Sequence, residues 1–420
     1  MILSNISVPL LGMVDTGVVG HLDSPVYLGA VAVGAMVFSF LYTGANFLRM
    51  GTTGITAQSY GADDNDGLRV ALGQAVIVAL AMAAVMIALQ RPIESLAMGL
   101  VGADPGVEAG AIEYFRIRIW SAPGTLANMV LIGWFIGLSN ARVPLLIFLT
   151  INVTNIVLDL IFVIGLGMKV DGVALASVIA EYTGLAVGLT FAARSLRRRT
   201  GHWPMERLTK VREYAAFFAV NANLLVRTLA LVFAIAFVTA QGARLGPVIL
   251  AANAILMNFQ NLMAFGLDGL AHAVEALAGR AVGQKNRAAF ERAVKLCLKW
   301  SLYFAIGYAA AYAVGGPLLI AILTDIDEVR VATNMYLPWM IASPLISVWS
   351  FLYDGVFVGA TRAKEMRNIM LVCTFVVFLP AWYLLLPFGN HGLWLAFMIF
   401  MAARGLGMHI VYRQRVLPAV

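Results

Sequence analysis

Charged residues are scarce in this chain of 420 residues, because Asp, Glu, Lys and Arg together make up 12% while hydrophobic residues make up 61%. A soluble domain usually carries about 25% charged residues, so this composition excludes one and indicates an integral membrane protein. The apolar stretches have the roughly 20-residue length that crosses a hydrocarbon core, and they lack the two-residue alternation of an outer-membrane barrel. The predicted fold is an all-α bundle of transmembrane helices.

Motifs of catalysis are also missing. The sequence contains no H-E-x-x-H, no G-x-S-x-G and no paired C-x-x-C, and its two cysteines, Cys297 and Cys373, have no metal or redox spacing. We therefore predict no enzyme activity, no metal site and no cofactor. The absence of G-x-x-x-x-G-K excludes an ATP-driven pump within this chain, so any transport is expected to use an ion gradient or a partner.

Breaks rich in charge, Gly or Pro divide the apolar sequence into twelve predicted spans. They cover residues 1–21, 26–57, 69–89, 107–138, 144–167, 172–193, 214–241, 247–278, 293–314, 331–360, 368–387 and 391–412. One long polar linker, 194–213, separates a six-span N-terminal lobe, 1–193, from a six-span C-terminal lobe, 214–420.

Basic residues are unevenly distributed among the connections. Most Lys and Arg follow even-numbered spans, and the linker alone holds the run Arg197-Arg198-Arg199. The positive-inside rule then predicts that both termini and the linker are cytoplasmic, in a bacterial-type inner membrane. The net charge of +7 is explained by this topology and by attraction to anionic membrane lipid. It requires no nucleic-acid partner, and no obligatory protein partner is inferred.

The chain also matches itself when it is shifted by 222 residues. Gly44 meets Gly266, Gly61 meets Gly283 and Gly137 meets Gly359, while Pro25-Val26 meets Pro247-Val248. Backbone geometry dictates where Gly and Pro stand, so their coincidence at one offset indicates a repeat. Because six spans is an even number, the halves are parallel repeats, and a cleft between such repeats is the expected route of an alternating-access transporter.

The first half holds acids in the middle of its spans. Asp15 lies in the first span, and Asn152, Asn155 and Asp159 share one face of the fifth span. A carboxylate inside a membrane is expensive and is usually retained for ion or substrate traffic. Two carboxylates in one low-dielectric site cannot both ionise cheaply, so we expect Asp15 and Asp159 to carry a proton. The alternative is that Asp159 only accepts hydrogen bonds from Asn155 and nearby hydroxyls.

Other ionisable residues have weaker claims to a coupling role. Glu113 and Arg116 are spaced to neutralise each other, and Glu181 lies one turn from Ser177, where it could pair with an arginine or extend the polar stripe. The remaining candidates are in the second half: Asp268, His272 and Glu275 on one face of the eighth span, and Asp354 in the tenth. The three-residue column has no recognised zinc spacing, and pairing with Arg227 or Arg280 is its simpler explanation.

The segment Pro9 to Thr16 (PLLGMVDT), His21-Leu22, and Asn155 with Asp159 resemble the multidrug and toxic compound extrusion (MATE) family, specifically its DinF-type branch. The similarity covers essentially the whole chain. In that family a first-helix Asp and a fifth-helix Asn/Asp pair form a proton-responsive pocket in the N-terminal lobe, which the resemblance places at Asp15, Asn155 and Asp159. By the same resemblance, Tyr114 and Ser177 match a tyrosine and a hydroxyl residue lining that pocket.

The expected function is a proton-coupled antiporter that exports lipophilic or cationic compounds. NorM-type members use a seventh-helix Glu in a sodium site, whereas the seventh span here offers Arg227 and no acid, so sodium is the less favoured coupling ion. A sodium-coupled drug antiporter remains one alternative. A flippase for a lipid-linked precursor, from a related superfamily with the same two lobes, is another, although such a protein should line its cavity with Arg or Lys.

Overall fold

The computed structural model describes residues 25–420, and this part of the chain is helical with no strand. The predicted first span, with Asp15 and Pro9, lies outside the described residues. The chain divides into two compact units, which meet in sequence between Phe217 and Phe218 and which we name the N-lobe and the C-lobe. The linker 194–213 is part of the N-lobe.

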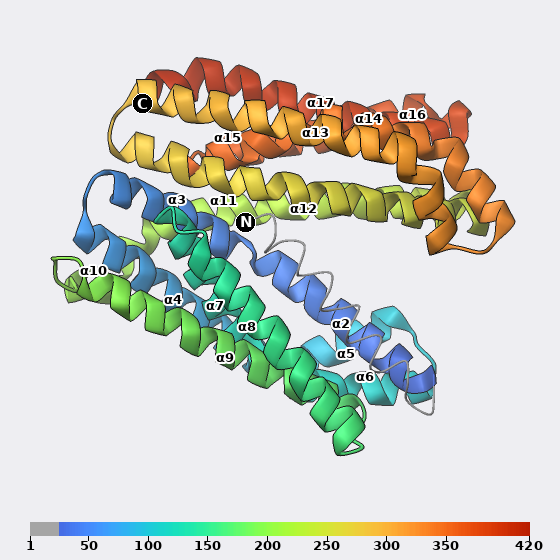
Figure 1. Cartoon of the computed structure of the whole chain (residues 1–420), viewed down its shortest axis with the longest axis horizontal. Helices are drawn as coiled ribbons and strands as arrows, with labels where there is room; N and C mark the ends of the chain where they lie inside the picture. The colour runs from blue at the N-terminus through green and yellow to red at the C-terminus, as the bar shows by residue number, and fades with distance from the viewer. Residues whose placement is uncertain (1–24) are drawn as a thin grey trace. The chain divides into compact units, whose positions relative to one another are not determined.

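The N-lobe consists of helices joined by short turns (Figure 1). Their bounds are α2 Pro25–Ala45, α3 Phe47–Gly61, α4 Asn65–Ala88, α5 Gln90–Val101, α6 Pro105–Arg118, a 3-10 turn Ile119–Ser121, α7 Ala122–Gly137, α8 Arg142–Asp159, a π-helical segment Leu160–Gly165, α9 Val170–Arg197, α10 Met205–Thr209 and a 3-10 turn Val211–Tyr214. Its buried core includes Phe38, Tyr114, Phe115 and Ile119.

The C-lobe contains longer helices. Their bounds are α11 Ala215–Arg244, α12 Pro247–Gly283, α13 Arg287–Leu323, α14 Asp327–Gly359, α15 Ala363–Val372, a π-helical segment Cys373–Phe378, α16 Leu379–Leu384, a 3-10 turn Leu386–Phe388, α17 Gly389–Val411, a π-helical segment Tyr412–Val416 and a 3-10 turn Leu417–Ala419. Its core is dominated by large side chains, among them Phe259, Met340, Phe378 and Trp394.

Eleven helical stretches within residues 25–420 are long and apolar enough to cross a membrane. They correspond one to one with the second to twelfth predicted spans, so the all-α membrane fold is confirmed. Two adjacent helices form a single span in places, as α2 with α3 and α6 with α7 do.

The two lobes share backbone details at the offset of 222 residues. Asp63 and Lys285 have positive φ angles of 54° and 52°, and Ser139 and Thr361 have 58° and 53°. Each of these residues ends a helix in the left-handed conformation that usually favours glycine. The following helices are capped alike, because Asp64 Oδ1 accepts a bond from Gly67 N at 2.8 Å and Asn286 Oδ1 accepts one from Ala289 N at 2.9 Å. These pairs are independent structural evidence for the repeat.

Close packing of helices repeats as well. Gly133 and Gly137 of α7 lie against the backbone of α3, where a Cβ on Gly133 would stand 2.4 Å from the carbonyl oxygen of Arg49. Gly355 and Gly359 of α14 lie in the same way against α12, with a Cβ on Gly355 2.4 Å from Ala271 O. Small residues four apart let membrane helices approach this closely. The shared Gly137 and Gly359 therefore mark one helix contact present in both lobes.

The basic linker is bound to α4 of the N-lobe by a buried arginine. Arg69 Nη1 donates to Thr200 O at 3.1 Å, and Arg69 Nη2 donates to Leu196 O at 3.1 Å and Arg199 O at 3.0 Å. Further along, Gln74 Nε2 donates to Arg207 O at 3.1 Å. These bonds satisfy the last carbonyl groups of α9 and hold the linker on the lobe.

Candidate functional site

The polar stripe predicted for the fifth span lies on α8 and faces the interior of the N-lobe. Asn152, Asn155 and Asp159 are buried, and Asp159 has no exposed surface. Val153 and Val157, on the opposite face, are each about half exposed. The helix is thus polar inside and apolar outside, the reverse of a helix in a soluble protein, as expected for a helix that faces lipid.

Two of the predicted site residues are in direct contact. Asn155 Nδ2 donates a hydrogen bond to Ser177 Oγ at 3.2 Å, which joins α8 to α9. The sequence pattern does not predict this contact, and its alternative of Asn155 as a donor to Asp159 stays a prediction. The α8 and α9 helices lie side by side along their length (Figure 1), so the two polar groups meet between their axes.

Asp159 occupies an irregular point of its helix. It is the last residue of α8, and the chain continues directly into the π-helical segment Leu160–Gly165. A π-helical turn inserts an extra residue and is often found at functional sites. The carboxyl group therefore lies where the α-helix gives way to a π-helical turn. It is buried inside the N-lobe.

Tyr114 lies on α6 and is buried in the aromatic part of the N-lobe core. Its ring contacts the backbone of Gly34 so closely that a Cβ there would come within 2.3 Å, and it packs edge-on to Phe38 with 6.3 Å between the ring centroids. The same core cluster includes Val173 and Ala174, one turn before Ser177. Tyr114 and Ser177 thus belong to neighbouring parts of one lobe.

Glu181 belongs to a second polar cluster, centred on α7. Asn128 Nδ2 donates to Glu181 Oε2 and to Glu181 O, both at 2.9 Å. Arg118 is close enough for its charge to act on Glu181. The two roles considered for Glu181, pairing with an arginine or extending the polar stripe, stay predictions. Sequence reasoning missed Asn128, although a lone amide in the apolar run from Leu126 to Ile136 was a usable signal.

The expected pairing of Glu113 with Arg116 is wrong. Glu113 is exposed on α6, and Arg116 instead forms a two-pronged ion pair with Glu94 of α5. Arg116 Nε donates to Glu94 Oε2 at 2.9 Å and Arg116 Nη2 donates to Oε1 at 2.8 Å. A fork geometry between guanidinium and carboxylate is stronger than a neighbouring pair on one helix, which explains the exchange.

In the C-lobe, Asp354 is held between two arginines. Its Oδ2 accepts a hydrogen bond from Arg404 Nη2 at 3.0 Å and a short one from Arg227 Nη2. All three side chains are buried and come from α14, α17 and α11. Sequence reasoning had not identified Arg404, although a lone Arg in the apolar run from Met401 to Gly407 was visible.

The column Asp268, His272 and Glu275 lies on α12, and Glu275 is buried. Asp268 is near enough to Arg404 for the two charges to interact. Of the two arginines expected to pair with this column, Arg227 is bonded to Asp354, and the pairing with Arg280 stays a prediction. Within residues 25–420, no three His, Cys, Asp or Glu side chains are grouped to hold a metal ion.

Comparison with known proteins agrees with the architecture. The MatE family model matches residues 1–161 and 224–384, two stretches displaced by nearly the offset of the internal repeat. The chain is 43% identical to DNA damage-inducible protein F of Escherichia coli, over 99% of this chain and 90% of that one. It is 24% identical to multidrug resistance protein MdtK of Edwardsiella ictaluri, over 98% and 93% of the two chains.

A solved structure shows the same fold. An outward-facing multidrug resistance MATE family transporter of the MOP superfamily superposes with a TM-score of 0.85 at 22% identity, covering all of this chain and 94% of the other. The fold, the family match in both halves and the 43% identity all indicate the same family. This multi-pass membrane protein therefore belongs to the MATE family, a family of transporters and not of enzymes, as its sequence resemblance indicated.

Proposed function

We propose that this protein is a proton-coupled antiporter that exports lipophilic, often cationic, compounds from the cytoplasm. The observation that carries the proposal is Asp159, a fully buried carboxyl group at the start of an irregular helical turn. An ionised carboxylate is expensive in such a place, and a bound proton removes the charge while leaving the side chain's shape unchanged. Binding and release of a proton there change the polarity of the N-lobe interior.

The transport cycle follows from competition. A substrate binds while Asp15 and Asp159 are ionised, and protons arriving from outside neutralise the acids and release the substrate. Asn155 and Ser177, already joined to each other, provide the polar surroundings that accept either form of Asp159. Alternating access of the two six-helix halves carries the site from one face of the membrane to the other.

The names of related proteins support the substrate class. The relative from Edwardsiella ictaluri is named a multidrug resistance protein. A relative from Acinetobacter baylyi is named a probable multidrug resistance protein. We therefore expect its binding partners to be small-molecule substrates, which it transports without a second protein. Lipophilic cations suit a site that combines carboxylates with apolar walls.

Sodium coupling, the first alternative, has little support in the C-lobe. A sodium ion needs several oxygen ligands, as other hard cations do. The acid best placed to supply one, Asp354, has two guanidinium groups on its Oδ2 atom. The arginines thus occupy the place that a cation would take.

A lipid-linked precursor flippase, the second alternative, would need cationic groups that line its transport cavity and are free to bind a pyrophosphate. Arg227 and Arg404 of the C-lobe carry such groups, but both are buried and bonded to Asp354. The buried polar face of α8 in the N-lobe presents the acid Asp159 instead. The antiporter therefore remains the function we propose.

The test is dye efflux from vesicles containing the purified protein. A pH gradient at equal sodium on both sides should drive uptake or release of a lipophilic cationic dye. A sodium gradient without a pH gradient should not. Full activity under the sodium gradient, abolished by Asp354→Asn, would show that the ion and the lobe are both wrong.

A further inference from the structure

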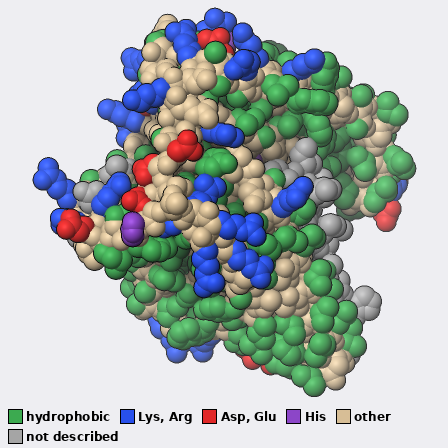
Figure 2. All heavy atoms as spheres, turned by 60° about the vertical axis from the view of Figure 1, so that its left-hand side comes forward, with side chains coloured by type: hydrophobic (Ala, Val, Ile, Leu, Met, Phe, Trp, Pro, Cys, Tyr) green, Lys and Arg blue, Asp and Glu red, His purple; other side chains and the backbone are tan. Residues whose placement is uncertain are grey.

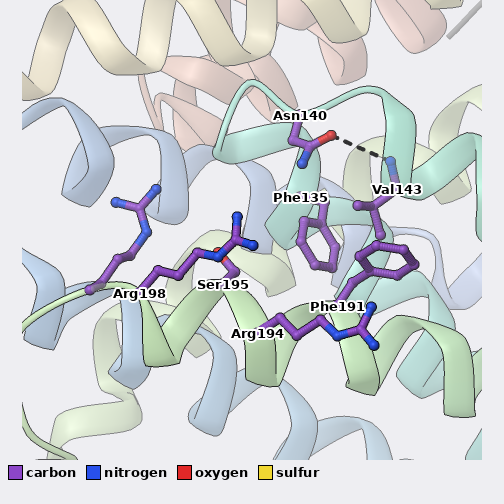
Figure 3. A pocket seen from close by; sticks show the side chains of 8 residues that line it. Phe135, Asn140, Val143, Phe191, Arg194, Ser195 and Arg198 are labelled. Atoms are coloured by element: carbon purple, nitrogen blue, oxygen red, sulfur yellow. Dashed lines mark hydrogen bonds between the residues drawn. The ribbon is translucent and has the colours of Figure 1, made fainter.

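The N-lobe has a pocket at the end where α7 stops, α8 starts and α9 stops, with a volume of about 520 Å³. It is independent of the buried carboxyl group described above. Arg194, Arg198 and Arg199 line it from α9 and the residues just beyond its end, while Asn140 faces them from the α7–α8 turn (Figure 3). Helices that cross the membrane begin and end at this level, so the pocket lies at the depth of the lipid headgroups.

The charge of the pocket is entirely positive. No Asp or Glu lines it, and within the described residues none of the three arginines has an ion pair. Two of them rest on aromatic rings, Arg194 over Phe191 at 5.8 Å and Arg199 over Tyr60 at 5.0 Å. Such contacts orient a guanidinium without neutralising it. Among the described residues, the pocket therefore holds three arginines without an ion pair, and two of them are oriented by aromatic rings.

A neutral donor faces the same space. Asn140 Oδ1 accepts bonds from the backbone nitrogens of Arg142 at 3.1 Å and Val143 at 3.4 Å. With the amide oxygen used in this way, the amide nitrogen of Asn140 points toward the pocket (Figure 3). An amide N–H group next to guanidinium groups is a suitable donor for an anionic oxygen.

The end of a helix normally repels anions, because its last carbonyl groups carry partial negative charge. Here Arg69 binds the carbonyl oxygens of Leu196, Arg199 and Thr200. Its buried guanidinium reduces that repulsion at the end of α9 and in the residues that follow it. Figure 2 shows a face of the molecule on which many Lys and Arg side chains are exposed.

Apolar side chains complete the pocket. Phe135 and Val143 are buried beneath it, and Phe191 lies beside Arg194. A free inorganic phosphate would make no use of this surface, whereas a phospholipid places glycerol and acyl carbons next to its phosphate. The combination of cations and hydrocarbon therefore favours a lipid over a free ion.

The corresponding turn of the C-lobe lacks these properties. At the repeat offset, Asn140 and Val143 correspond to Arg362 and Glu365, and Arg362 Nη1 lies 3.5 Å from Glu365 Oε1. In that turn the arginine is therefore paired with an acid of its own segment. The unpaired basic pocket is thus a feature of the N-lobe and not a general consequence of the fold.

We propose that this pocket binds the phosphate of an anionic phospholipid headgroup, with Arg194, Arg198 and Arg199 around the phosphate and the lipid carbons against Phe135 and Phe191. The sequence alone predicted only a general attraction of the linker to anionic lipid. The pocket turns that attraction into a defined site.

Native mass spectrometry of the purified full-length protein, titrated with phosphatidylglycerol, phosphatidylcholine or sodium phosphate, tests this proposal. Phosphatidylglycerol should bind the wild type more tightly than phosphatidylcholine does, and Arg198→Gln should weaken phosphatidylglycerol by about tenfold. Arg197→Gln is the matched control, because it removes the same charge one residue away from an exposed side chain that does not line the pocket. The control should bind phosphatidylglycerol within about twofold of the wild type.

A second measurement guards against misfolded variants. Phosphatidylglycerol should raise the melting temperature of the wild type and of Arg197→Gln, and should raise that of Arg198→Gln less. If Arg197→Gln and Arg198→Gln lost phosphatidylglycerol binding equally, the binding would depend on general surface charge. That result would overturn the proposed site. Binding of sodium phosphate as tight as that of the lipid would overturn the assignment to a phospholipid.

Discussion

At the scale of single residues, buried charges in this protein are distributed unequally between the lobes. The described N-lobe buries Asp159 at an irregular turn of α8, whereas the C-lobe buries Asp354 between Arg227 and Arg404. A carboxylate that accepts hydrogen bonds from two guanidinium groups is held in place, and its charge is compensated by its partners. The carboxyl group available for proton exchange is therefore expected in the N-lobe.

Replacing Asp159 with Asn should abolish proton-driven efflux and leave the protein folded, because the amide keeps the shape of the side chain and cannot exchange a proton. Asn155→Ala should be less damaging, since it removes the bond to Ser177 but no titratable group. Dye efflux at matched expression measures both. Asp104→Asn, which changes an exposed acid at the start of α6 and keeps a good helix cap, is the control. Wild-type efflux by Asp159→Asn would refute the coupling role.

Glu94 makes a second residue-scale prediction, on stability and pH. Its hydrogen bonds with Arg116, and then the charges of Arg116 and Arg91, hold the pKa of Glu94 below its ordinary value of 4.5 despite partial burial. A lowered pKa means that the ion pair stabilises the fold above that value and is lost as the pH falls through the folded-state pKa.

Glu94→Gln should therefore lower the melting temperature at neutral pH, and the difference from the wild type should shrink as the pH drops below 4.5. Glu206→Gln, which breaks an exposed pair with Lys210, should have little effect at any pH. A difference between wild type and Glu94→Gln that stays constant as the pH falls from neutral to well below 4.5 would show that the pair does not act through its charge.

At the scale of helices, the four glycines at the α3–α7 and α12–α14 contacts set how closely the helices approach. Gly355→Ala should destabilise the protein by about 1–3 kcal/mol, because its methyl group would stand 2.4 Å from the carbonyl oxygen of Ala271 and the backbones would have to separate. Gly307→Ala in α13 is the matched control, since nothing lies within 4 Å of the added carbon. It should be neutral or slightly stabilising.

Thermal unfolding of both variants in detergent separates these outcomes. Equal changes in melting temperature for Gly355→Ala and Gly307→Ala would show that close helix packing does not require the glycines at these contacts. The same comparison in the N-lobe, with Gly133→Ala, should give a similar loss because a Cβ there meets Arg49 O at the same distance.

At the scale of the whole molecule, the distribution of Lys and Arg makes a prediction about topology. We expect both termini and the linker inside the cell, so His202→Cys in the linker should resist a membrane-impermeant maleimide in intact cells. Glu328→Cys, an exposed position in the first turn of α14, should be labelled. The native Cys297 and Cys373 are buried and give a low background. Labelling of His202→Cys but not of Glu328→Cys would show that the topology is the opposite of the one we predict.

Composition and spacing alone determined the class of this protein. The length of each apolar run predicted eleven spans within the described residues, because a helix must satisfy its backbone bonds inside the membrane. The offset of 222 residues predicted the repeat, because Gly137 and Gly359 occupy a contact that tolerates no side chain. These features depend on local geometry, which a sequence records directly.

Contacts between residues far apart in the sequence could be identified only from the tertiary structure. Arg404 and Arg227 stand 50 and 127 positions from Asp354, and no local spacing could join them. Glu94 replaced Glu113 as the partner of Arg116 because a fork between two helices is better than a neighbour on one. The bond of Asn155 to Ser177 and the pocket beside Arg198 arise in the same way. A pairwise contact depends on which helix faces meet, and only packing decides that.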